Sequence, residues 1–144
     1  METLTKEEYK KLKETTLKDL WKSNCPFCDF KTQWDRVVWK GKFLYITHAL
    51  CPYMWMKDHL MIIPYLHRKY TYDMTKQEFW ELKEAELFIK NYYWDKHYFS
   101  FIRETMWDRS LEHLHYHFLP WSVHSCLDWW DLNNEGYLLG INLK

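Results

Sequence analysis

The chain has 144 residues, equal numbers of acidic and basic side chains, and 47% hydrophobic residues. This size and composition predict one folded domain with its own core and exclude an intrinsically disordered chain. The formal net charge of zero argues against bulk electrostatic binding to nucleic acid or anionic membranes, but leaves room for a local basic pocket. With only three glycines, the chain contains neither a P-loop nor a dinucleotide-binding glycine motif.

Neither a membrane anchor nor a secretory signal is expected from the sequence. No apolar run approaches the length of a transmembrane helix, and the first twenty residues are charged throughout. We therefore expect a reducing, cytoplasmic compartment, in which disulfides are disfavoured. Two of the four cysteines, Cys51 and Cys126, are isolated in the sequence and are expected to be buried as small apolar side chains.

In chain order, residues 3–22 predict a helix within an N-terminal extension over 1–23, with Thr5 as the N-cap. Runs of aromatic and branched residues then predict the strands of a main domain over 24–120. These strands are expected at 34–39, 43–47, 59–63, 97–103 and 113–119.

The clearest helix is predicted over 75–93. Thr75 and Glu78 form a T-x-x-E capping box, and apolar side chains recur at helical spacing behind it. These elements make about five strands and one long helix. Residues 121–144 are expected to form a tail that packs on this domain or on a partner subunit.

The sequence Cys25-Pro-Phe-Cys28 is a candidate half of a metal site. Two thiolates at this spacing reach one tetrahedral ion, but zinc needs two further ligands. No second such pair exists, so histidine, another cysteine or a carboxylate would have to complete the site. The alternative is a pair of buried or redox-active thiols.

A second candidate site is His113-Leu-His115-Tyr-His117, in which histidine alternates with apolar residues. In a strand this pattern projects all three imidazoles from one face and sends the alternating apolar side chains into a core. A solvated polar strand face and a plain three-histidine metal site are the simpler alternatives.

The residues around these histidines resemble the histidine triad (HIT) family of nucleotide hydrolases and transferases. The family signature is His-φ-His-φ-His-φ-φ, where φ is apolar, and residues 113–119 match it. Upstream, an apolar strand led by His59 runs into Pro64-x-x-His67, and residues 73–75 precede the helix as in the family. The Cys-x-x-Cys pair is similar to that of the zinc-containing members, and the resemblance extends over residues 24–120. The resemblance implies that the predicted strands and helix form an α+β fold with an antiparallel sheet.

The resemblance implies a structural zinc ion held by four side chains: Cys25, Cys28, His67 and His113. Two thiolates and two imidazoles make a closed tetrahedral site with no position left for a reactive water. The zinc ion would then fix the backbone just before the middle histidine of the triad.

The resemblance also implies the chemistry of a nucleotide hydrolase. His115 would attack the α-phosphate of a dinucleoside polyphosphate or nucleotide conjugate, forming a nucleotidyl-histidine that water then cleaves. His117 would bind phosphate oxygens or protonate the leaving group. His59 would lie at the edge of the site, and the Ser110 hydroxyl would donate to the α-phosphate or to the leaving atom. Family members are commonly homodimers, so a homodimer is expected.

The segment over 103–112 departs from the family, because many members have a glycine-rich stretch here and this chain has no glycine. Arg103 and Arg109 would then supply the phosphate contacts, since arginine binds phosphate with two parallel hydrogen bonds. The alternative is that both pair with neighbouring acidic residues on the surface. A ribose-binding acid is also not evident, and Tyr45, Tyr53 or Trp55 would either stack on a base or pack in the core.

Two other functions remain open on the sequence. The altered loop favours a zinc-stabilised nucleotide-binding or interaction module with little turnover. A nucleotidyltransferase would use the same intermediate and pass the nucleotide to an acceptor other than water.

Overall fold

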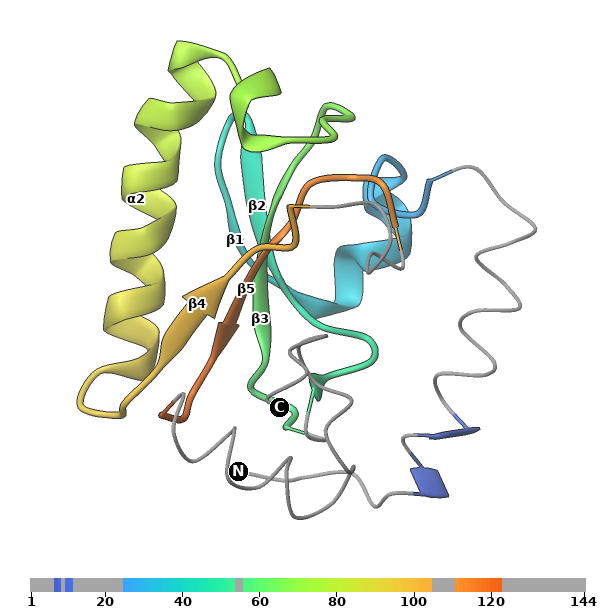
Figure 1. Cartoon of the computed structure of the whole chain (residues 1–144), viewed down its shortest axis with the longest axis vertical. Coiled ribbons are helices and arrows are strands. Elements are labelled where there is room, and N and C mark those ends of the chain that lie inside the picture. The colour runs from blue at the N-terminus through green and yellow to red at the C-terminus, as the bar shows by residue number, and fades with distance from the viewer. Residues whose placement is uncertain (1–6, 9, 12–24, 54–55, 105–110, 123–144) are drawn as a thin grey trace, which may run out of the picture.

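The computed structural model of the chain describes residues 7–8, 10–11, 25–53, 56–104 and 111–122. These residues form a five-stranded antiparallel sheet in the order β1-β2-β3-β5-β4, with one long helix along one face (Figure 1). The elements are η1 (Phe30–Arg36), β1 (Val37–Lys40), β2 (Leu44–His48), β3 (Leu60–Pro64), η3 (Thr71–Asp73), α2 (Lys76–Tyr93), β4 (Phe99–Phe101) and β5 (Tyr116–Leu119).

This architecture confirms the predicted α+β class. Most of the predicted N-terminal helix, Cys126 and the tail from residue 123 onward lie outside the described residues. In the part of the chain that the structure describes, no helix has the length and apolar character needed to cross a bilayer.

Strands β1 and β5 each begin three residues later than the sequence predicts. Residues 30–36 form η1 because the Asp29 carboxylate caps it, accepting a hydrogen bond of 3.2 Å from the backbone N–H of Lys31. At the triad, strand β5 begins only at Tyr116, so the strand prediction was wrong over 113–115. The Leu114 N–H donates to the carbonyl of Arg68 at 2.6 Å, so it is not available for sheet pairing. Strand β4 is also shorter than predicted and covers only Phe99–Phe101.

Side chains alternate across the sheet and form two clusters. The larger cluster lies between the sheet and α2, and includes Leu114 and Phe118, as the triad pattern predicts. The smaller cluster lies on the other face around Phe27 and includes Met61, which pairs with His117 in the register of β3 and β5. Because directly paired residues share a face, His117 belongs to the face away from α2.

Helix α2 begins at the predicted capping box. The Thr75 hydroxyl accepts from the N–H of Glu78, and the buried Glu78 carboxylate accepts from the Thr75 N–H at 2.6 Å. Further along the helix, the Glu81 carboxylate accepts three backbone N–H groups of the β1–β2 turn, from Lys42, Phe43 and Leu44, at 2.6–2.7 Å. This carboxylate therefore fixes the helix to the hairpin.

Gly41 makes room for that carboxylate. A Cβ atom at residue 41 would lie 2.5 Å from the carboxyl carbon of Glu81. We therefore expect Gly41→Ala to lower the free energy of unfolding by about 1–3 kcal/mol, because the carboxylate must leave its three donors. Urea denaturation measures this loss. In a Glu81→Ala variant, Gly41→Ala should lower the free energy of unfolding much less. An equal loss with and without Glu81 would contradict a clash with its carboxylate.

Candidate functional site

The Cys-x-x-Cys segment folds as a tight turn on the face of the sheet away from α2. The N–H groups of Cys28 and Asp29 both donate to the Cys25 carbonyl, at 3.1 and 3.4 Å. The buried hydroxyl of Tyr45, from β2, donates to the Phe27 carbonyl at 3.1 Å. These contacts turn both thiols toward the same point and hold the segment on the sheet.

Two histidines that are distant in the sequence complete this cluster. The Nδ1 atom of His113 lies 3.4 Å from the sulfur atoms of both Cys25 and Cys28, and Nδ1 of His67 lies 3.3 Å from the sulfur of Cys28. All four candidate ligand atoms lie within 4.8 Å of one another. The structure therefore brings together the four residues that the resemblance assigned to zinc.

The donor set fits a tetrahedral zinc ion. Ordinary Zn–S and Zn–N bonds at tetrahedral angles separate sulfur from nitrogen by roughly 3.6 Å, close to the distances found here. The Nε2–H group of His113 donates to the Pro64 carbonyl at 2.8 Å, which leaves the Nδ1 lone pair for a metal. Burial and the adjacent Cys25 thiol raise the pKa of Cys28 to about 11, so metal binding at neutral pH releases protons.

Arg68 links this cluster to the helix. Its guanidinium pairs with the buried Glu78 carboxylate at 3.2 Å, and its carbonyl accepts the Leu114 N–H. One residue therefore fixes the backbone beside both His67 and His113. This connection explains why two ligands 46 positions apart by residue number meet in space.

The backbone also sets the proton position on the middle histidine. Nδ1 of His115 lies 2.7 Å from the carbonyl of His113, so we assign it as the protonated nitrogen that donates to that carbonyl. In the neutral imidazole the lone pair then lies on Nε2. This tautomer is the one that a nucleophile attacking through Nε2 requires.

His59 and His117 form a buried hydrogen-bonded pair. Nδ1 of His59 accepts the backbone N–H of Tyr53 at 3.1 Å, so its proton lies on Nε2. That Nε2–H donates to Nδ1 of His117 at 2.9 Å, which leaves the proton of neutral His117 on Nε2. Within the described residues this buried Nε2 has no hydrogen-bond partner, so it is a donor for a ligand oxygen.

Burial keeps this pair neutral. Burial, with smaller contributions from His115 and His48, lowers the pKa of His59 to about 3. Burial likewise holds the pKa of His117 well below its ordinary value, with smaller contributions from His115, His59 and Arg103. Both imidazoles are therefore uncharged at pH 7, which suits hydrogen bonding rather than ion pairing.

The buried pair makes stability depend on pH. An unfolded imidazole with a pKa near 6.5 takes up a proton that the folded pair excludes, so stability is full above that pH and falls below it. We expect the free energy of unfolding to fall by roughly 1.4 kcal/mol per pH unit for each histidine between about pH 6.5 and about pH 5. Urea denaturation across this range measures the slope. His59→Gln should reduce the slope of the unfolding free energy against pH, whereas His97→Gln, at an exposed histidine, should leave the slope unchanged. Equal slopes in the two variants would contradict the conclusion that buried His59 contributes to the pH dependence.

Aromatic rings enclose the pair. The Phe101 ring stacks on the His117 imidazole, with centroids 4.7 Å apart, and Tyr53 stacks on His59 at 5.1 Å. The Arg103 guanidinium carbon lies 5.1 Å from the Tyr53 ring centre. The imidazole of His115 contacts that of His117 at 4.6 Å between centroids, so the nucleophile candidate borders the same enclosure.

The predicted site residues differ in how far the structure describes them. His59, which the resemblance placed at the edge of the site, is 1% exposed and hydrogen-bonded to His117. Ser110 and Arg109 lie outside the described residues. The sequence did not single out Phe101, and Tyr53 was only one of three aromatic candidates, because their role depends on contacts across the sheet. Cys51, expected to be buried, is half-buried.

Comparisons with known proteins were made on sequence and on structure. No family model and no curated protein matches the sequence. Several solved structures match the fold. A HIT family protein from Bacillus subtilis superposes with a TM-score of 0.54 at 20% identity, covering 69% of this chain and 74% of that protein.

Two further structures agree with this result. A HIT family hydrolase from Legionella pneumophila has a TM-score of 0.53 at 22% identity, covering 67% of this chain and 91% of that one. The Plasmodium falciparum diadenosine triphosphate hydrolase has a TM-score of 0.53 at 15% identity, covering 67% and 72%. Together with the sheet order and the single long helix, these matches show that the chain has the fold of the histidine triad family.

Proposed function

We propose that this chain is a nucleotide hydrolase that acts on the α-phosphate of a dinucleoside polyphosphate or nucleotide conjugate. The observation that carries the proposal is the hydrogen bond from Nδ1–H of His115 to the His113 carbonyl, which leaves the Nε2 lone pair for attack on phosphorus. One structural neighbour is a diadenosine triphosphate hydrolase, which supports this substrate class.

The reaction would proceed in two displacements. Nε2 of His115 forms a bond to the α-phosphorus while the bond from phosphorus to the leaving group breaks, and the electron pair stays on the leaving group. His117 is suited to bind that leaving group as a neutral hydrogen-bond donor, because its Nε2–H lacks a partner among the described residues. Water then attacks the same phosphorus, the bond from phosphorus to Nε2 breaks, and its electron pair returns to the imidazole. The nucleoside monophosphate leaves, and the proton of the attacking water passes to solvent.

We propose that the four-residue cluster of Cys25, Cys28, His67 and His113 holds a structural zinc ion. Two thiolates and two imidazoles fill a tetrahedral coordination shell, so the ion would stabilise the fold rather than activate water. The ion would fix the carbonyl of His113, which orients His115. Thiolate ligands also favour a reducing compartment such as the cytoplasm.

The test of the proposed function is product formation by zinc-loaded protein. The panel consists of dinucleoside polyphosphates, nucleoside phosphoramidates, nucleotide sugars and mononucleotides. We expect release of a nucleoside monophosphate from at least one of the first two classes. Products that carry the nucleotide on an added phosphate or sugar phosphate would indicate a transferase instead, and binding without any product would indicate a binding module.

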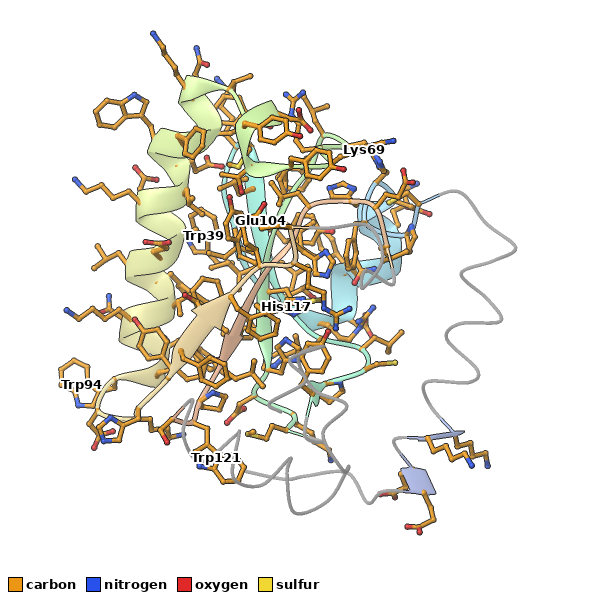
Figure 2. The ribbon with its side chains drawn as sticks, viewed as in Figure 1. Trp39, Lys69, Trp94, Glu104, His117 and Trp121 are labelled. Atoms are coloured by element: carbon orange, nitrogen blue, oxygen red, sulfur yellow. The ribbon has the colours of Figure 1, made fainter. Side chains whose placement is uncertain are left out.

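We further propose a homodimer. Strand β4 is the last strand of the sheet order, and it pairs only with β5 among the described strands. Three large apolar side chains at seven-residue spacing along and just beyond α2 are mostly exposed: Trp80, Leu87 and Trp94. Trp94 points away from the body of the domain (Figure 2). Sedimentation as a single monomeric species would contradict this proposal.

A further inference from the structure

Arg103 lies two residues beyond the end of β4, close to the imidazole cluster. Phe101, in β4, pairs directly with His117 in β5 and stacks on its ring. Arg103 follows Phe101 by two residues, just beyond the end of β4, and its charge reaches the His117 imidazole.

An aromatic ring holds the guanidinium group at this position. The guanidinium carbon of Arg103 lies 5.1 Å from the centre of the Tyr53 ring, within the range of a cation–π contact. The same ring is stacked on His59 and lies 5.2 Å from the His117 ring, centroid to centroid. The positive charge of Arg103 is therefore held beside the imidazoles by the ring that also packs on them.

Glu104, which follows Arg103 in the chain, is exposed, whereas Arg103 itself is half-buried. Burial lowers the pKa of His117 most, and the Arg103 charge is among the groups that lower it further.

The guanidinium group of Arg103 and the Nε2–H group of His117 are donors that suit a phosphate ligand. A guanidinium group donates two parallel hydrogen bonds to two oxygens of one phosphate, and its charge offsets the negative charge that builds up on a leaving phosphate. The adjacent donor at Nε2 of His117 points to the same kind of ligand, an anionic oxygen. A neutral amine leaving group would gain nothing from this arginine.

We propose that Arg103 forms an anion subsite for the leaving group, so that the preferred substrates are nucleoside polyphosphates rather than phosphoramidates. This inference rests on the proposed hydrolase function and narrows its substrate class. The subsite contributes to catalysis by binding the phosphate next to the bond that breaks, and it has no role when the leaving group is an amine.

The test compares two substrates in matched variants. Diadenosine triphosphate has a phosphorylated leaving group, and adenosine 5′-phosphoramidate has a neutral one. Arg103→Gln should lower kcat/KM for the polyphosphate by about 100-fold, and for the phosphoramidate by less than about threefold. Arg103→Lys keeps the charge without the paired donors and should give an intermediate loss on the polyphosphate alone.

Controls separate this subsite from a structural effect. Arg36→Gln removes a half-buried arginine of η1 that is bound to Gln33, and it should leave the ratio of the two kcat/KM values unchanged. Thermal unfolding and zinc content verify that each variant is folded. If Arg103→Gln does not fold, Arg103→Lys serves as the test instead. The ratio of its kcat/KM values for the two substrates then shows whether the loss is selective for the polyphosphate.

The possible outcomes are distinguishable. Equal losses on both substrates, or no loss on the polyphosphate, overturn the anion subsite while the hydrolase function stands. If the wild-type protein turns over neither compound, the proposed function fails and the subsite fails with it. A selective loss on the polyphosphate supports both.

Discussion

His115→Ala is expected to abolish release of nucleoside monophosphate, with a loss of at least about 10⁴-fold in kcat. The substitution removes the nitrogen whose lone pair attacks phosphorus, and no neighbouring group among the residues that the structure describes is suited to replace it. Nε2 of His117 carries a proton, and Nδ1 of His113 faces the two cysteine sulfur atoms. Rapid-quench kinetics with chromatographic detection of the monophosphate measures the loss.

The matched control for this variant is His97→Ala. His97 is exposed and lies outside the imidazole cluster, so its removal should leave kcat unchanged within about twofold. His117→Ala should slow the reaction less than His115→Ala, because it removes a donor and leaves the nucleophile in place. Residual activity above about one per cent of wild type in His115→Ala would mean that another group attacks phosphorus.

Removal of zinc is expected to have the largest effect on stability. The fold contributes the four ligands from the cysteine turn, the end of β3 and the segment before β5, so the ion would join three separate parts of the chain. Protein purified without chelators should contain about one zinc ion per chain. A strong chelator, or Cys28→Ser, should lower the melting temperature by more than about 10 °C, because the energy of metal binding is part of the folding energy.

Cys51→Ser is the control for the metal ligand. This half-buried cysteine is not part of the four-residue cluster, so its substitution should change neither the zinc content nor the response to chelator. Freshly purified protein with well under one zinc ion per chain would contradict the proposed site. So would a Cys28→Ser variant that retains full zinc content.

The elements that the sequence predicted well have local causes. The helix predicted over 75–93 is observed as Lys76–Tyr93, because the capping box acts within four residues and the apolar stripe repeats along one segment. Strands β2 and β3 lie within one residue of their predicted bounds, since continuous apolar runs suit central strands.

The elements that the sequence predicted poorly depend on distant partners. A period of two predicted a strand from His113 onward, but the Leu114 N–H is bound to Arg68, 46 positions earlier by residue number. In the site, the position of His59 also depends on a partner that is distant in the sequence. The resemblance placed it at the edge of the site, and the structure shows it buried and hydrogen-bonded to His117, next to the paired strands β3 and β5. The arrangement of Tyr53 and Arg103 likewise depends on side-chain contacts that no spacing in the sequence encodes.

Attack by His115 on phosphorus is tested by detection of the covalent intermediate. Zinc-loaded protein is mixed with diadenosine triphosphate, quenched without acid and analysed by intact-protein mass spectrometry and peptide mapping. We expect a transient mass increase of one nucleotidyl group, located on His115, that decays as nucleoside monophosphate appears. Turnover without any adduct, or an adduct on another residue, would contradict attack by His115.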